Sequence, residues 1–336
     1  MTRGNEPRNP PVPSSAGTRK GFIVKASRYI FAALLLAFVS VPLAAQLNDT
    51  YVIPAAANVP GAFNTRWMTR FSVFNPQSYT LRVAVVYMPT GGGTGLDATF
   101  DVPANAVAHS DNILKDLFDL NTASGALLVA TFPEDNPSVE DKVIARAFLV
   151  TTDTFNNAPN GTFGQTIPGV WAGLMDFQSD GITAIAHGVR NLSREGWRAN
   201  VGAVNLGRTN VRLQVSVYDI DGNTILNKAP FNIPPLGHIQ DGLPVQVDRG
   251  AVEFFLDDPT QKAVVFPYVS VIDQLSGDPT YFSPTLLATP KTLFGKQGMP
   301  VADTTTMGRK ITIADARAAR ENATHVGAVQ LKTKAR

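Results

Sequence analysis

The sequence contains no cysteine and only four histidines among its 336 residues. Without cysteine, disulfide scaffolds, thiolate zinc sites and cysteine nucleophiles are excluded. The nucleophile elbow GxSxG, the zinc motif HExxH, the P-loop and the dinucleotide motif GxGxxG do not occur either. These absences predict a protein that is not an enzyme and carries no cofactor of a common motif class.

Charged residues are also few, at 17%, whereas hydrophobic residues make up 44% of the chain. This composition excludes a wholly disordered chain and supplies enough apolar side chains for real cores. At about 100 to 200 residues per domain, the length leaves room for one large domain or two ordinary ones. We therefore expect a globular protein over most of the chain.

The N-terminal segment has the features of an export signal. Residues 1–28 contain six basic residues and one acidic residue, and an apolar run follows at residues 29–41. Small residues at Ala44 and Ala45 predict cleavage after residue 45, which makes residues 1–45 a signal peptide. Because the run falls short of the roughly 20 apolar residues of a transmembrane helix, no membrane span is expected after cleavage. The protein is therefore predicted to be periplasmic, on the cell surface or extracellular.

The pair Arg19-Lys20 is similar to the twin-arginine export pattern, but lysine stands where the second arginine should be. Secretion of the unfolded chain is therefore favoured, with export of the folded protein as the alternative. Substituting both residues with glutamine distinguishes the two routes, because only a twin-arginine substrate would then be retained.

The positive net charge belongs to the two ends of the chain. Residues 46–303 carry 16 basic and 24 acidic residues, a net charge of −8. An acidic body argues against nucleic acid as a partner. The segment 291–336 is basic and lacks strand alternation, so we expect a flexible C-terminal tail that could touch anionic envelope polymers.

Period-2 alternation of apolar residues dominates the body and predicts β-strands. Thr69, Phe71 and Val73 share one face of a strand, a turn begins at Asn75, and a second strand alternates from Leu81. We expect these two strands to form a hairpin with one buried face.

The same layout returns about 130 residues later, after Trp197, with a turn at Asn205. A second match aligns residues 142–153 with residues 262–273 at an offset of 120, and His109 and His238 follow similar Pro-containing segments. We interpret this as an internal duplication. It predicts an all-β protein of two tandem antiparallel β-sandwiches, residues 46–170 and 182–290, joined by a linker at residues 171–181.

At three places the chain resembles tandem Ig-like β-sandwich modules of secreted bacterial proteins. The matching runs are GAFNTRWMTRFSVFNP at residues 61–76, GTFGQ at residues 161–165 and SVIDQLSGDPTY at residues 270–281. The resemblance implies export and a sandwich fold. It implies no activity, because the matching positions are strand and turn determinants.

Three tryptophans and two aspartates are the candidates for binding. Trp67 and Trp197 occupy equivalent positions in the two repeats, which favours a shared role in the cores, whereas Trp171 lies in the linker and is the candidate for stacking on a sugar ring. Asp273 and Asp278 could clamp a calcium ion in a loop. The equivalence of His109 and His238 favours a structural role for both.

These observations predict a non-catalytic exported protein with a structural, adhesive or partner-binding role in the bacterial envelope or outside the cell. A carbohydrate-binding module that uses Trp171 is the first alternative, with an envelope polysaccharide as partner in place of an envelope protein. The second is an envelope hydrolase with carboxylates such as Glu134, Asp135 and Asp141, or Asp257 and Asp258, because sequence spacing does not exclude glycosidases.

Overall fold

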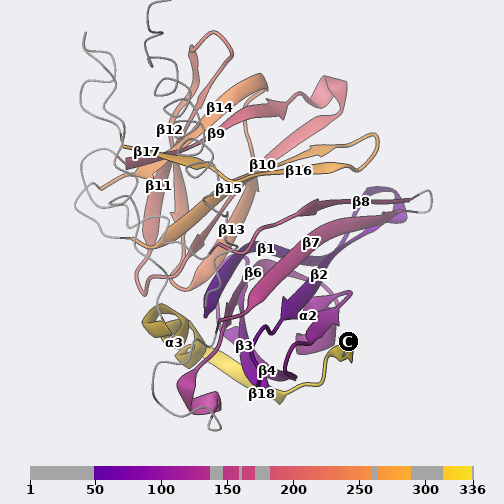
Figure 1. Ribbon diagram of the computed structural model, residues 1–336. Coiled ribbons are helices and arrows are strands. Elements are labelled where there is room, and N and C mark those ends of the chain that lie inside the picture. The colour runs from indigo at the N-terminus through magenta and orange to yellow at the C-terminus, as the bar shows by residue number, and fades with distance from the viewer. Residues whose placement is uncertain are drawn as a thin grey trace, which may run out of the picture. The chain divides into compact units, whose positions relative to one another are not determined.

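Most of the described residues of the computed structural model lie in β-strands, which form three sheets (Figure 1). The structure describes residues 49–136, 147–158, 161–170, 182–258, 263–288 and 313–334. The predicted signal peptide and the predicted linker with Trp171 lie outside these residues. The two β-rich halves belong to one unit, Leu47–Arg336. Within the described ranges, no helix is long and apolar enough to cross a membrane.

Eight strands of the first half belong to one sheet, in two groups with the orders β4-β3-β6-β1 and β5-β2-β7-β8. Strand β1 pairs with β6 and, at its C-terminal end, with β2, so it joins the two groups. The bounds are β1 (Thr50–Pro60), β2 (Arg66–Phe74), β3 (Leu81–Pro89), β4 (Gly95–Val102), β5 (Val107–Ser110), β6 (Ala123–Ala130), β7 (Leu149–Ala158) and β8 (Gly161–Thr166), with η1 (Ala62–Asn64), α2 (Ile113–Phe118) and η2 (Pro133–Asp135) in the connections.

The second half forms two separate sheets, β12-β11-β14-β9-β17 and β13-β10-β15-β16. Between them lies a core to which both sheets contribute, including Val201 and Val269 from one sheet and Leu213 and Phe254 from the other. The bounds are β9 (Ile182–Asn191), β10 (Trp197–Asn205), β11 (Val211–Tyr218), β12 (Thr224–Ile233), β13 (Gly237–Gly242), β14 (Val247–Leu256), β15 (Val265–Asp273), β16 (Pro279–Phe282) and β17 (Thr285–Ala288), with η3 (Ser193–Glu195) before β10.

The pairing pattern of the first eight strands is repeated by β9 to β16. The order β4-β3-β6-β1 corresponds to β12-β11-β14-β9, and β5-β2-β7-β8 corresponds to β13-β10-β15-β16. The first half also buries a core between its two groups, where the rings of Phe71 on β2 and Phe100 on β4 meet edge to face at 6.3 Å. The strand order of the first half therefore recurs in the second half, as an internal duplication predicts.

The strands that flank the predicted turns exist, but the predicted hairpins are wrong. Phe71, Val73, Leu81 and Val83 are all buried, as their alternation predicts. However, β2 pairs with β1, β5 and β7, whereas β3 pairs with β4 and β6. In the second half, β10 and β11 lie in different sheets. The turn at each asparagine therefore carries the chain across the core and does not reverse it within one sheet.

A fully buried asparagine holds each of these crossings. The side-chain amide of Asn75 donates to the carbonyls of Tyr79, Val102 and Pro103 at 2.7–3.1 Å, and its Oδ1 accepts from the backbone N–H of Gln77. In the second copy, Asn205 donates to the carbonyls of Thr209, Ile233 and Pro234 and accepts from Gly207 N–H. Both side chains tie the crossing to the end of the following strand pair.

Pairing registers correct two details of the predicted repeat. Trp67 lies opposite Asn156 and Trp197 lies opposite Asp273, so β7 and β15 correspond at an offset of 117 and not 120. His109 lies opposite Ser72, which places it in correspondence with Gln240 and not with His238. The predicted matches found the right strands but slipped along them, by three residues between β7 and β15 and by two residues for His109. A strand buried at nearly every position, as β15 is, has no alternation that fixes the register.

The C-terminal segment differs from the expected flexible tail over residues 313–334. It forms α3 (Ile313–Glu321), β18 (Ala323–Ala328) and β19 (Lys332–Lys334). Ala316 and Ala319 of α3 are buried in an apolar cluster with Phe132. β18 pairs in parallel with β4, and β19 pairs with β5, so the segment extends both groups of the first half.

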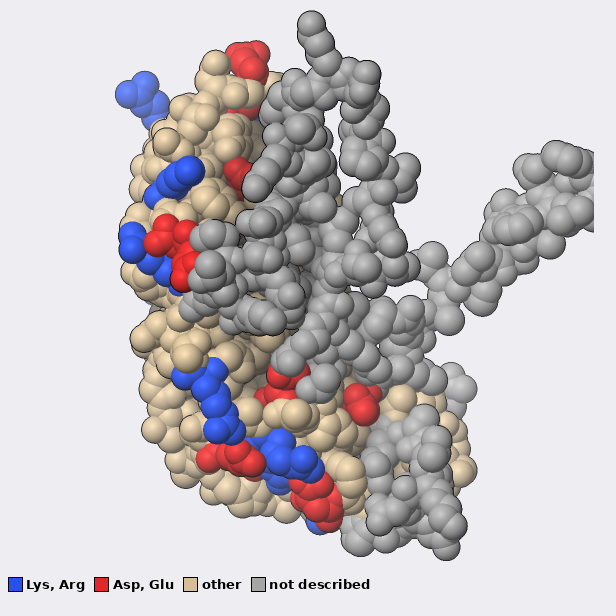
Figure 2. Space-filling model, turned by 90° about the vertical axis from the view of Figure 1, so that its left-hand side faces the viewer, with Lys and Arg blue, Asp and Glu red and all other residues tan. Residues whose placement is uncertain are grey.

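Both arginines of α3 form ion pairs. Arg320 pairs with Asp135 and, at 3.0 Å, with Asp97, whose side chain is only 3% exposed, and it lies over the ring of Phe132. Arg317 pairs with Glu134 at the surface. On the face shown in Figure 2, basic and acidic side chains lie next to one another rather than in patches of one sign. Arg317 and Arg320 of the basic C-terminal segment therefore pair with acidic residues of the same chain.

The two halves are joined by apolar packing and by a short β-bridge. Val52, Val86 and Leu128 of the first half share a buried cluster with Val204 and Phe266 of the second. Next to this cluster, Thr90 bridges to His238, and the N–H of Gly91 donates to the carbonyl of His238 at 2.8 Å. This junction fixes how the outer face of the sheet β13-β10-β15-β16 meets the first half.

We expect Asn205→Ala to destabilise the protein by about 3 kcal/mol, because it leaves buried carbonyls without a donor. Asn157→Ala, which changes an exposed asparagine on β7, should have little effect. Urea unfolding of both variants tests this prediction, and equal stabilities would contradict the role assigned to Asn205.

Replacing Arg320 with alanine should leave the Asp97 carboxylate buried with less compensation, at a cost of about 3 kcal/mol. Arg317→Ala removes an exposed pair and should cost less than about 1 kcal/mol. Limited proteolysis provides the readout: cleavage between α3 and β19 should accelerate in the Arg320 variant only.

Candidate functional site

The predicted calcium ligands lie in the turn between β15 and β16. Asp273 Oδ1 accepts from the backbone N–H of Leu275, and its Oδ2 accepts from the hydroxyl of Ser276 at 2.7 Å. The Asp273 N–H donates to the carbonyl of Asp278. The bond from Ser276 and the backbone bond from Leu275 lower the pKa of Asp273. The carboxylate therefore stabilises the turn itself.

A metal site at this turn stays a prediction. Within the described part of the chain, no three His, Asp or Glu side chains lie close enough together to hold a metal ion. Trp171, the predicted sugar-stacking residue, lies outside the described residues. Among the described residues, Asp273 and Asp278 therefore have no third carboxylate or histidine beside them.

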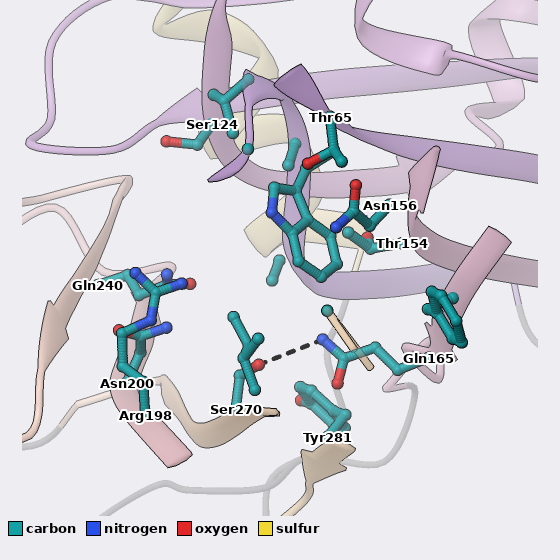
Figure 3. A pocket seen from close by; sticks show the side chains of 18 of the residues that line it. Thr65, Ser124, Thr154, Asn156, Gln165, Arg198, Asn200, Gln240, Ser270 and Tyr281 are labelled. Carbon is teal, nitrogen blue, oxygen red and sulfur yellow. Dashed lines mark hydrogen bonds between the residues drawn. The ribbon is translucent and has the colours of Figure 1, made fainter. Parts of the chain in front are cut away.

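A cleft of about 890 Å³ lies between the two halves, beside the junction (Figure 3). One wall continues the inner face of β2, β7 and β8, and the other is the outer face of β13, β10, β15 and β16. In Figure 3, Thr154 and Asn156 lie on one side, and Arg198, Asn200 and Gln240 on the other. The polar and aromatic residues that line it are Thr65, Trp67, Ser124, Thr154, Asn156, Phe163, Gln165, Arg198, Asn200, His238, Gln240, Tyr268, Ser270, Gln274, Ser276 and Tyr281.

The first copy has polar residues in this wall where the second copy has core residues. Thr69 and Thr154 lie opposite each other and their hydroxyls are 2.8 Å apart. The equivalent pair in the second half is Ala199 and Val271, both buried in its core. Alignment of the repeats at the correct register is the sequence signal that would have pointed to this end of β7.

Two residues that line this cleft have a buried amide oxygen with no hydrogen-bond donor. Asn156 Oδ1 and Gln165 Oε1 accept no hydrogen bond from the described residues, although Asn156 is only 5% exposed. Gln165 does use its nitrogen, which donates to Ser270 Oγ at 3.2 Å across the cleft. A buried acceptor without a donor costs about 1–3 kcal/mol, so both oxygens favour a ligand that donates hydrogen bonds.

The two tryptophans that are equivalent in sequence have different surroundings. Trp197 packs against the core of the second half and lies under the guanidinium of Arg190 at 5.1 Å. Trp67 is half-buried and lines the cleft. The expectation of a shared core role therefore describes Trp197, whereas Trp67 presents an aromatic surface to the cleft.

A directional chain of hydrogen bonds runs from the first half through His238 to the cleft wall. The Tyr268 hydroxyl donates to Gln240 Oε1 at 2.7 Å, so it accepts from His238 Nε2–H at 2.8 Å. His238 Nδ1 then accepts from the hydroxyl of Thr90, which in turn accepts from Ser124. These roles follow because each hydroxyl and a neutral imidazole have one proton to donate.

Close packing fixes the ring of Tyr268 in this chain. Gly202 on β10 lies opposite Tyr268, and a Cβ at this glycine would approach the Tyr268 ring to 2.2 Å. The ring also stacks on Tyr281 at 5.5 Å. Burial raises the pKa of both phenols, so both stay neutral. The amide of Gln240 is therefore presented to the cleft by a rigid support.

The described lining of the cleft carries few charged groups. Among the described lining residues, Arg198 is the one with a formal charge, and none has a carboxylate. Burial lowers the pKa of His238 to about 3, so its imidazole is neutral near pH 7. Hydrolysis of a glycosidic bond by paired carboxylates has no acid or base in this lining. The arrangement can bind and orient a polar ligand.

No protein-family model matches the chain, and a search of curated proteins finds no similar sequence.

His238 should make stability depend on pH. An unfolded histidine takes up a proton below a pKa of about 6.5, whereas the folded one stays neutral down to about 3. Stability is therefore full above pH 6.5 and falls as the pH falls toward 3, with a loss of about 2 kcal/mol between pH 7 and pH 5.

Urea unfolding of the wild type and of His238→Gln at pH 7 and pH 5 tests this. The glutamine variant should lose about 2 kcal/mol less than the wild type over this interval. Parallel losses in both proteins would show that His238 is not the group responsible.

Proposed function

We propose that this protein is an exported, non-catalytic binding protein of the bacterial envelope, in which two tandem Ig-like β-sandwich modules hold a polar ligand between them. The repeated strand order and the core in each half support the sandwich description. The basic and apolar N-terminal segment supports export. A protein that binds a ligand and does not convert it would have a structural, adhesive or partner-binding role.

The cleft carries this proposal. Its volume of about 890 Å³ lies within the roughly 300–1,000 Å³ of small-molecule sites. It also contains convergent polar groups held in place by packing, namely Asn156, Gln165 and the supported amide of Gln240. In a protein under selection for stability alone, the inward threonines of β7 would be apolar, as their counterparts on β15 are.

A hydrolase that uses carboxylates is less well supported. Glu134, Asp135 and Asp257 pair with Arg317, Arg320 and Arg212, respectively. None of these acidic residues lines the cleft. Their pairing favours roles in stability and solubility.

Thermal unfolding of the full-length chain, exported and purified, tests the proposed function. A ligand at 100 times its dissociation constant stabilises the folded state by about 2.7 kcal/mol, which raises the melting temperature by about 5 °C. We expect such a shift with one class in a panel of soluble polysaccharides, peptides, and calcium against EDTA.

Two cleft variants locate the site. Ser270→Phe fills the cleft and Gln165→Leu removes the amide that donates to Ser270, and either should abolish the shift. Ser78→Trp, in the exposed turn before β3, is the control and should preserve it. Absence of a shift with every ligand class, or turnover of any of them, would overturn the proposal.

A further inference from the structure

We propose that the ligand of this cleft is a saccharide, which stacks on Trp67 and donates hydroxyl hydrogen bonds to Asn156 Oδ1 and Gln165 Oε1. This inference rests on the proposed function and names its ligand class. It also transfers the sugar-binding role expected of Trp171 to residues that the cleft brings together from both halves.

The two amide oxygens require donors from the ligand. Asn156 and Gln165 belong to neighbouring strands, β7 and β8, where their registers place them on one face of the ladder. Both oxygens are buried, and neither accepts from the described part of the chain. Sugar hydroxyls are neutral donors that also accept, which suits the amide nitrogens of Asn200 and Gln240 on the facing wall.

An aromatic wall beside a row of amides matches the two kinds of surface on a sugar ring. The C–H face of a pyranose is apolar and packs against an aromatic ring, whereas its edge carries the hydroxyls. Trp67 and Tyr281 supply aromatic surface, and Asn156, Gln165 and Asn200 supply the polar groups. A purely apolar ligand would leave the amides without hydrogen bonds.

The strand pairing argues against an extended peptide. A peptide that adds to a sheet needs a free strand edge. The central strands of the walls have neighbours on both sides, namely β2 and β7 in the first half and β10 and β15 in the second, whereas β8, β13 and β16 are edge strands. Trp67, Asn156 and Asn200 therefore present side chains from the interior of the sheets, and a peptide added to the edge of β8, β13 or β16 would not use them.

The charge of the lining argues against phosphates and metal ions. Arg198 is the single cationic group of the described lining, and no carboxylate is there to hold a cation. One guanidinium is well matched to at most one carboxylate, as in a sugar acid. Neutral and uronic acid oligosaccharides share the ring and hydroxyl chemistry, and binding experiments separate them.

Isothermal titration of the full-length protein with soluble oligosaccharides provides the test. The probes are neutral oligomers of glucose, xylose and N-acetylglucosamine, and an oligomer of galacturonic acid. Binding of one or more is expected, and Arg198→Gln should weaken only the acidic probe. An equal loss of affinity for neutral and acidic probes would show that Arg198 does not bind a carboxylate of the ligand.

The variant Asn156→Leu separates a binding role from a structural one. Leucine has a similar volume and no unpartnered acceptor, so the melting temperature should stay the same or rise. Affinity should fall about tenfold, the scale of one lost hydrogen bond with its desolvated partner. A variant that loses stability in proportion to affinity would assign Asn156 to the fold and overturn its role in binding.

The repeat supplies a matched pair for the aromatic contact. Trp67→Leu should weaken saccharide binding about tenfold or more, whereas Trp197→Leu, at the equivalent position outside the cleft, should lower the melting temperature and keep the affinity. Equal effects of the two substitutions on binding would contradict the stacking role of Trp67.

The outcomes also separate this inference from the proposed function. If peptides but no saccharide shift the melting temperature, the cleft binds a ligand and the saccharide assignment fails. If no class of ligand shifts it, the proposed function fails as well. Saccharide binding that survives both Asn156→Leu and Trp67→Leu would place the sugar elsewhere on the protein.

Discussion

The fold depends on a buried asparagine at the point where each half crosses its own core. Asn75 and Asn205 each satisfy three backbone carbonyls and one backbone N–H in a place that water does not reach. Buried backbone groups must be paired, and a chain that leaves one sheet for another has no ladder to pair them. By supplying those bonds, the asparagine determines that β2 and β3, or β10 and β11, face each other across a core and not along a hairpin.

Once this crossing is fixed, the two copies can differ in what fills the space between their sheets. The second copy places Ala199 and Val271 there and gains a continuous apolar core. The first places Thr69 and Thr154 at the same positions and continues to Asn156, whose Oδ1 is buried. Polar groups in core positions lower the stability of a protein. Such groups are kept mainly where a functional site requires them. The two copies in one chain therefore provide an internal comparison between an apolar core and a polar face at equivalent positions.

Alternation, turn residues and duplication could be predicted from the sequence, because each depends on local chemistry that repeats every two residues or at a turn. The partners of each strand could not be predicted, since the hairpin and the crossing share the same turn sequence. The register of the second match slipped by three residues, and this hid the correspondence of Asn156 with Asp273. The cleft could not be predicted because its walls come from strands of different halves, and Trp67 lines it only because the two halves meet there.

A neutral histidine, His238, contributes to the contact between the two halves. A neutral His238 donates to Tyr268 and accepts from Thr90. The chain of hydrogen bonds that also includes Ser124 and Gln240 therefore requires an uncharged imidazole. The chain begins at Ser124 in the wall of one half and ends at Gln240 in the wall of the other. Protonation would place a buried charge between the halves and take away the acceptor for Thr90. The geometry of the cleft and the stability of the junction are therefore set by the same protonation state, which couples any binding in the cleft to the pH at which the two halves stay together.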